Sequence, residues 1–214
     1  MYFIKLVQFN EIRRLLDPLC YSIVMKKMIN ILLFIQFFNL FADNLLGPVY
    51  AVYVKGIGGD LLTAGGALAL NLAVVGSLII LSGRIANKYH TEKLQLILGY
   101  SIGVLVAAGY LVIKTPIELF FIQILSGLSI AIAQPAFSGI FSSKLEKGKH
   151  TSSWGDYLGL TYWAAAISAL SSGFITQSFG FPALFYSMMI TQGLSVLGAI
   201  YLYYLPTKVS DAGK

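Results

Sequence analysis

Six long apolar stretches run along the chain, separated by short segments that carry charge, glycine or proline. The stretches cover residues 29–53, 62–81, 94–113, 117–141, 154–176 and 182–205. A helix needs about 20 mostly apolar residues to cross a hydrocarbon layer roughly 30 Å thick, and each stretch meets that length. The alternation of period two that a membrane barrel strand would show is absent. The pattern therefore predicts an all-α polytopic membrane protein with six transmembrane helices.

Composition excludes the other common classes of protein. Hydrophobic residues make up 57% of the chain and charged residues 11%, against roughly 25% charged in an average soluble domain. So few charged side chains cannot cover the surface of a soluble fold. Such an apolar chain is not disordered either, and Cys20 has no second cysteine with which to form a disulfide.

The positions of Lys and Arg predict the orientation in the membrane. With the N-terminus inside, thirteen of these residues fall on the inner side, and only Lys55 and Lys114 fall outside. The inner ones are Lys5, Arg13, Arg14, Lys26, Lys27, Arg84, Lys88, Lys93, Lys144, Lys147, Lys149, Lys208 and Lys214. Both ends are therefore expected in the cytoplasm. This rule accounts for the net charge of +6, and no clustered basic face points to nucleic acid.

The expected organisation is a cytoplasmic segment 1–27, a transmembrane domain 28–206 and a cytoplasmic tail 207–214. Met25-Lys26-Lys27-Met28 before an apolar run is typical of a translation start. Two interpretations of residues 1–24 stay open. They are an upstream extension, or an interfacial helix that holds Arg13 and Arg14 at the inner leaflet.

Asp43 is the strongest functional candidate, because a carboxylate at membrane depth costs several kcal/mol unless it is protonated, paired or wetted. Helical spacing puts it on one face with other polar side chains, which predicts a water-filled cavity or a polar partner. The alternative is a structural hydrogen-bond hub beside Gly47-Pro48, where a kink frees backbone groups. The candidate cavity residues are Asp43, Asn39, Asn44, Gln36, Asn71 and Gln134, with Tyr50 on the same stripe.

Small residues recur at four-residue spacing on three predicted helices, which permits close helix packing in lipid. The rows are Gly65, Ala69, Ala73 and Ser77; Gly99, Gly103 and Ala107; and Gly155, Gly159, Ala165, Ala169 and Gly173. One interpretation is packing within a single bundle. The other is that helices two and five face another bundle, because both carry small residues on more than one side.

Two prolines give a weak sign of internal symmetry. Pro48 falls about twenty residues into the first stretch and Pro135 about nineteen into the fourth. These two helices would cross the membrane in opposite directions, as expected of an inverted three-plus-three repeat.

The basic segment after the second stretch resembles a family motif. It reads Gly83-Arg84-Ile85-Ala86-Asn87-Lys88-Tyr89-His90-Thr91-Glu92-Lys93. The motif Gly-x-Leu-Ala-Asp-Arg-x-Gly-Arg-Lys follows the second span of major facilitator superfamily transporters. Asn87 stands in place of its acid and His90 in place of its second glycine. Gly127 with Gln134-Pro135-Ala136, and Gly173-Phe174 with Phe179-Gly180-Phe181, are similar to the family's fourth span and its five-to-six connection.

The resemblance implies one six-helix half of a twelve-helix fold. Spans one and four would line the central cavity and spans two and five would meet the other half. The segment with Gly83, Arg84, Asn87 and Lys88 would act as a gating loop, although Asn87 lacks the charge that the family's acid contributes. The fourth stretch contains no Lys or Arg, and so lacks the arginine that many proton-coupled members carry.

Two functions of different kinds follow. The first is a secondary transporter of a small molecule or ion in the cell membrane, working by alternating access as a homodimer or with a second six-helix chain through helices two and five. The alternative is a non-transporting half-bundle that binds another membrane protein. An intramembrane enzyme is not expected, because Ile124-Leu125-Ser126-Gly127 lacks the first glycine of a rhomboid-type motif and Asp43 stands alone. No cofactor is expected.

Overall fold

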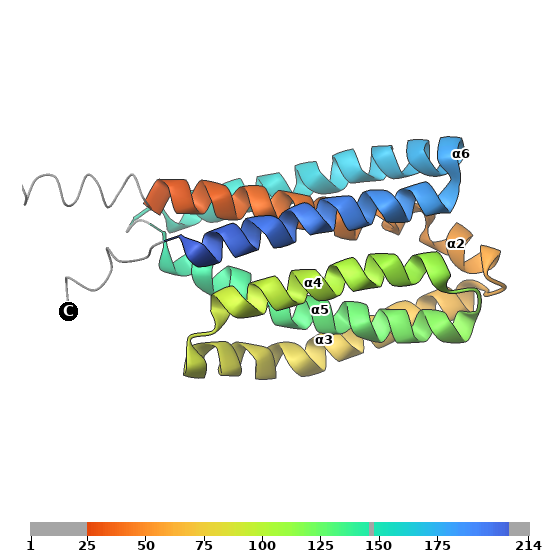
Figure 1. Ribbon diagram of the computed structural model, residues 1–214, viewed down its shortest axis with the longest axis horizontal. Helices are drawn as coiled ribbons and strands as arrows, with labels where there is room; N and C mark the ends of the chain where they lie inside the picture. The colour runs from red at the N-terminus through yellow and green to blue at the C-terminus, as the bar shows by residue number, and fades with distance from the viewer. Residues whose placement is uncertain (1–24, 146–147, 206–214) are drawn as a thin grey trace, which may run out of the picture.

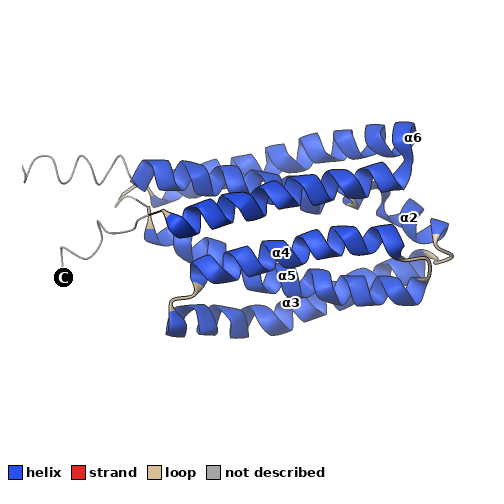
Figure 2. Cartoon of the chain, viewed as in Figure 1, coloured by secondary structure: helices blue, strands red, loops and turns tan. Residues whose placement is uncertain are grey.

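The computed structural model describes residues 25–145 and 148–205, and the described chain is an antiparallel bundle of helices without strands (Figures 1 and 2). The order of elements is a first helix over residues 25–45, the 3₁₀ turn η1 (Gly47–Val49), α2 (Tyr50–Gly56), α3 (Leu61–Tyr89), α4 (Glu92–Val112), α5 (Pro116–Ser143) and α6 (His150–Tyr204). Residues 1–24, 146–147 and 206–214 lie outside the described residues, and with them the expected N-terminal segment up to residue 24, Lys147 and the tail. The predicted all-α class is confirmed.

The first apolar stretch is broken rather than continuous. Its helix ends at residue 45, the η1 turn follows with Pro48 inside it, and α2 resumes the path at Tyr50. Proline lacks the N–H that an interior helical position requires, so the break falls at Gly47-Pro48. Tyr50 therefore lies on α2, beyond the break, and does not share one continuous helical face with Asp43.

The longest helix, α6, contains a turn. Gly180 has φ 79° and ψ 176°, a conformation outside the helical region, and Pro182 follows it. Two arms meet there, and Figure 1 shows them running antiparallel from the turn. Only glycine adopts this backbone region readily. The turn therefore lies where the sequence indicated a break between the fifth and sixth stretches.

The segment of residues 83–93, which was expected to be a loop, is mostly helical. Helix α3 continues through Tyr89, His90 ends it in a left-handed conformation (φ 51°), and α4 begins at Glu92. Polar side chains at a membrane surface do not oppose helix formation, because water solvates them while the backbone stays hydrogen-bonded. The proposed gating segment is therefore helical.

Two helices begin with side-chain caps at the opposite end of the bundle. Asp60 accepts hydrogen bonds from the backbone and hydroxyl of Thr63, both at 2.7 Å, and these bonds lower the pKa of Asp60 from its ordinary value. Thr115 and Glu118 form a capping box at the start of α5. Both segments were expected as breaks, and the caps define where the next helix starts.

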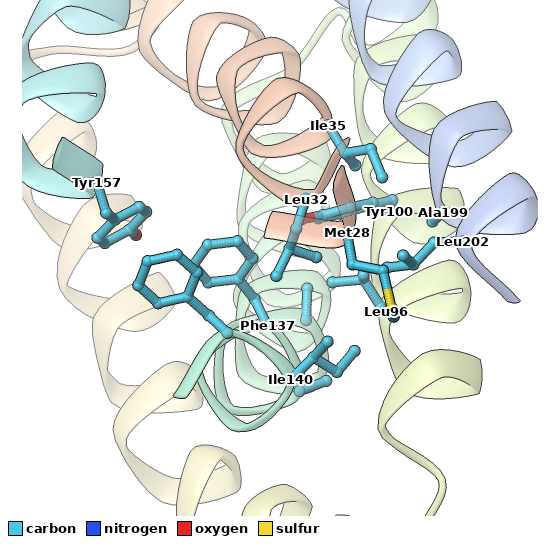
Figure 3. Close-up of a cluster of buried hydrophobic side chains, with 13 residues drawn as sticks. Met28, Leu32, Ile35, Leu96, Tyr100, Phe137, Ile140, Tyr157, Ala199 and Leu202 are labelled. Atoms are coloured by element: carbon cyan, nitrogen blue, oxygen red, sulfur yellow. The ribbon is translucent and has the colours of Figure 1, made fainter. Parts of the chain in front are cut away.

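Two hydrophobic cores hold the bundle together. One lies toward the end where the first helix begins and joins Leu32 of that helix to Leu96, Tyr100, Phe137 and Leu202 (Figure 3). The other lies toward α2 and contains an aromatic group of Tyr53, Tyr110 and Phe185. The polar residues of the candidate site lie between these two cores.

Five described helices are long and apolar enough to cross a membrane, counting α6 as one. They are Met25–Gly56, Leu61–Tyr89, Glu92–Val112, Pro116–Ser143 and His150–Tyr204. Their outer faces expose many large apolar side chains, such as Leu72, Leu105, Phe121 and Leu170. In water this surface would be unfavourable, and in a bilayer it contacts lipid.

Candidate functional site

A cavity of about 290 Å³ lies among the first helix, α3, α4, α5 and the second arm of α6. Its lining is mostly apolar, with a few polar side chains that converge on it. The polar and aromatic residues that line it include Asp43, Tyr50, Asn71, Tyr110, Gln123 and Gln192. A cavity of this composition is typical of a small-molecule site.

Asp43 is the one charged residue among those that line this cavity. It lies in the last turn of the first helix, and the residue is exposed. Asn39, one turn earlier, donates a hydrogen bond from Nδ2 to Asp43 Oδ2 at 2.9 Å. An ionised carboxylate only accepts hydrogen bonds, so this contact suits the anion.

Gln192 extends this contact into a chain across the bundle. Its Nε2 donates to Asn39 Oδ1 at 2.8 Å, linking the second arm of α6 to the first helix. Gln192 is 2% exposed, and its Oε1 is buried without a hydrogen-bond partner among the described residues. Gly103 of α4 lies against the Gln192 amide so closely that a Cβ there would collide with Nε2. The absence of a side chain at Gly103 is what lets the amide reach Asn39.

A smaller cavity adjoins Asp43 on the other side of Asn39. It is lined by Gln36, Asn39, Asp43, Tyr100 and Gln134, among others. The hydroxyl of Tyr100 donates to Gln36 Oε1 at 2.5 Å, and both residues are buried. Gln36 and Gln134 are therefore close to Asp43 but contact the smaller space, not the main cavity.

Asn71 and Gln123 form a second polar group on the wall of the main cavity. Asn71 Nδ2 donates to the backbone oxygen of Gln123 at 2.9 Å, which ties α3 to α5. The Gln123 side chain donates to the Tyr50 hydroxyl at 2.8 Å and to the Tyr110 hydroxyl at 3.4 Å. These bonds hold two aromatic hydroxyls at the cavity wall.

Two groups of predicted site residues lie elsewhere. Asn44 donates to the backbone oxygen of Leu40 at 2.7 Å and lines neither cavity, because that bond turns it back along its own helix. Arg84, Asn87 and Lys88 are exposed on the last turns of α3, and Gly83 packs against Pro135. They lie at the end of the bundle where the first helix begins (Figure 1).

Sequence patterns did not indicate Gln192, Tyr100 or Tyr110 as site residues. Each lies on a helix with little polar periodicity, and a single glutamine or tyrosine in an apolar stretch is most often an interhelical bond. The row of small residues that contains Gly103 did indicate a close helix contact. The sequence did not indicate which residue would make that contact.

The small residues of α3 and of the first arm of α6 form exposed rows. A Cβ added at Gly65 or Gly76 of α3, or at Gly159 or Gly173 of α6, would meet nothing within 4 Å. By contrast, a Cβ at Gly99 of α4 would lie 2.6 Å from that of Ala133. The α4 row therefore packs within the bundle, whereas the rows on α3 and α6 do not.

The described residues contain no group of three or more His, Cys, Asp and Glu side chains that could hold a metal ion. What the fold and cavity define is a multi-pass membrane protein whose helices surround a small polar site near the middle of the bundle.

A sequence model described as Major Facilitator Superfamily matches residues 32–214, and the chain belongs to this family. It is a transporter of the cell membrane. The chain is also 26% identical, over 162 residues, to an "Uncharacterized MFS-type transporter YitZ" of Bacillus subtilis (strain 168). That alignment covers 73% of this chain and 95% of the relative.

Proposed function

We propose that the chain is a secondary transporter that moves a small solute by alternating access, with the substrate held in the cavity beside Asp43. The observation that carries this proposal is the position of a single carboxylate on the wall of a cavity inside an apolar bundle. Such a group is costly in lipid unless it faces water or a ligand. Asn71 and Gln123 supply the neutral polar contacts, and Asn39 holds the carboxylate from the side of the smaller cavity.

The working architecture is six spans in a three-plus-three inverted repeat. Met25–Gly56 counts as one span and the two arms of α6 as two. The matching prolines support the repeat, since Pro48 lies in η1 and Pro135 lies inside α5, although only the first of the two helices is interrupted there. In this architecture the fourth span is α5, which contributes Gln123 and Ser129 to the cavity.

Both ends of the chain are proposed to be cytoplasmic. Support comes from the segments that gather at one end of the bundle in Figure 1: the start of the first helix, the turn at His90, the start of α6 and residue 205. Most of the described cations lie there, whereas Lys55 and Lys114 lie at the other end. This distribution follows the positive-inside rule.

A second six-helix bundle is proposed to complete the transporter, with a second copy of the chain as the simplest candidate. The exposed glycines of α3 and of the first arm of α6 support this, because flat glycine surfaces allow helices to approach closely. Two copies related by an axis along the membrane normal would bring two Asp43 residues to one central space.

Uptake into proteoliposomes tests the function without assuming a substrate. The full chain is reconstituted, a defined mixture of amino acids, sugars, nucleosides, organic acids and organic amines is supplied, and the vesicle contents are measured by mass spectrometry. We expect at least one solute to accumulate above protein-free vesicles. Asp43→Asn is expected to reduce that uptake by about tenfold or more, the scale of one lost charged contact.

Asp156→Asn is the matched control, because Asp156 is exposed on α6 and does not line the cavity. It should leave uptake unchanged. Absence of uptake of every solute by the wild-type chain contradicts the transporter, and full uptake by Asp43→Asn removes Asp43 from the mechanism.

A further inference from the structure

The described residues that line the main cavity contribute a negative charge and no positive charge. Asp43 is its only charged side chain, and no Lys, Arg or His occurs among the described residues that line it. The rest of the wall is apolar or aromatic, with neutral polar groups. A negatively charged or strongly polar solute would lose its hydration there without a compensating charge.

The hydrogen bonds around Asp43 run in one direction. Gln192 donates to Asn39, and Asn39 donates to Asp43. Reversing the Gln192 amide would place its oxygen against Asn39 Oδ1, so that two acceptors would face each other. The observed orientation instead leaves Gln192 Oε1 buried, with no hydrogen-bond partner in the part of the chain that the structure describes. An unpaired buried acceptor is unfavourable, and in this arrangement it accompanies the orientation in which Asn39 donates to the carboxylate.

The donor that Asn39 directs at Asp43 fixes the position of the carboxylate and supplies a hydrogen bond that the anion accepts. The anion then needs a positive partner inside an apolar wall. Tyr50 and Tyr110 line the same cavity, and aromatic rings attract a cation that lies close to them. Their hydroxyls are held by Gln123, so both rings are fixed in place.

We infer that the substrate is an organic cation with an apolar body, that Asp43 is its counter-ion, and that Gln192 is a positioning residue that acts through Asn39. This inference rests on the proposed transport function and specifies its substrate class. It also gives the second arm of α6 a part in the site, in addition to the first and fourth spans that the family resemblance implies.

Binding of charge-matched probes tests the inference. The full chain in lipid nanodiscs is titrated with three sets of similar compounds, each a cation, a neutral alcohol and an anion: benzylammonium, benzyl alcohol and benzoate; the cyclohexyl analogues; and the n-hexyl analogues. Empty nanodiscs correct for partition into lipid. We expect at least one cation to bind tenfold or more tightly than its alcohol, with the carboxylate weakest.

The variants separate charge from positioning. Asp43→Asn should remove the preference for the cation over the alcohol. Gln192→Leu should reduce that ratio by roughly tenfold, because Asn39 loses the donor that orients it. Damage to packing would weaken cation and alcohol alike and leave the ratio unchanged, so an unchanged ratio in Gln192→Leu overturns the positioning role.

Gln95→Leu is the matched control, since Gln95 is a buried glutamine on α4 that contacts Ser82 and lines no cavity described above. The ratio of cation to alcohol affinity in Gln95→Leu should equal that of the wild type.

The inference is overturned if no cation in the panel is preferred by the wild type, or if Asp43→Asn keeps the preference. If the chain takes up a sugar or an acid and binds no cation preferentially, the transport function stands and the inference about the substrate class is rejected. Cation binding without uptake of any solute rejects transport and leaves the cation site.

Discussion

At the scale of single residues, glycines decide how closely the helices approach. Gly127 of α5 faces α3, and a Cβ there would lie 2.8 Å from the backbone oxygen of Asn71. A backbone atom cannot rotate away as a side chain can. The contact is next to the bond from Asn71 to Gln123, so a shift of α3 would also disturb the cavity wall.

Gly127→Ala is therefore expected to lower the free energy of unfolding by about 1–3 kcal/mol, the usual cost of overpacking a close contact. Unfolding followed by circular dichroism in detergent measures the change. Gly76→Ala on α3 is the control, because a Cβ there meets nothing within 4 Å. Equal stability of the two variants would contradict the close α3–α5 contact.

The type of each residue also determined whether the sequence could identify it as part of the site. Asp43 stood out because a carboxylate in an apolar stretch is rare and costly. Gln192 did not, because a neutral amide at membrane depth carries no comparable signal. Asn44 was included for its polarity alone, and its bond to Leu40 shows how a local backbone contact can satisfy a polar side chain.

At the scale of elements, the turn inside α6 depends on one backbone conformation. Gly180 has φ 79° and ψ 176°, a region that is essentially restricted to glycine. Gly180→Ala is expected to cost about 1–3 kcal/mol of stability, because the new side chain opposes that backbone geometry and not because it lacks space. The nearest side-chain atom to a Cβ there is 3.6 Å away.

Thermal unfolding in detergent measures this cost. Gly193→Ala, in a helical part of the second arm with open space around it, should be neutral or slightly stabilising, because alanine favours a helix over glycine. A Gly180→Ala protein that is as stable as Gly193→Ala would show that the turn tolerates another backbone geometry.

The ends of the helices were the least predictable feature of the elements. Hydropathy marks where the apolar part stops, whereas a helix stops where its backbone bonds end. Helix α3 continues past the apolar stretch to Tyr89, where His90 closes it. The capping box of Thr115 and Glu118, by contrast, agrees with the break expected around Pro116.

At the scale of the whole molecule, the exposed glycine rows predict where a second copy would pack. Gly65 lies near the start of α3 and Gly173 near the turn of α6 at Gly180. The start of α3 and the turn of α6 are at the same end of the bundle (Figure 1). In a symmetric dimer, α3 of one copy would face α6 of the other. Cysteines at both positions, in a Cys20→Ser background, should therefore give a covalent dimer in membranes treated with a short bifunctional maleimide.

The control moves one cysteine to the second arm of α6, as Gly65→Cys with Gly193→Cys. Position 193 is equally open but lies on the other arm, so little dimer is expected on a denaturing gel. Equal cross-linking of the two pairs would argue against a dimer through α3 and the first arm of α6.

By itself the sequence determined the class of protein, because the bilayer restricts what can cross it. An apolar stretch of sufficient length must be helical, and an acid within it must be sheltered, so hydropathy and Asp43 were informative without a fold. Which polar groups meet across the bundle was decided only by the tertiary structure. The bond from Gln192 to Asn39 joins residues 153 positions apart, and it forms because Gly103 and the turn at Gly180 bring two distant helices together. Contacts of that kind depend on packing geometry, which local pattern does not encode.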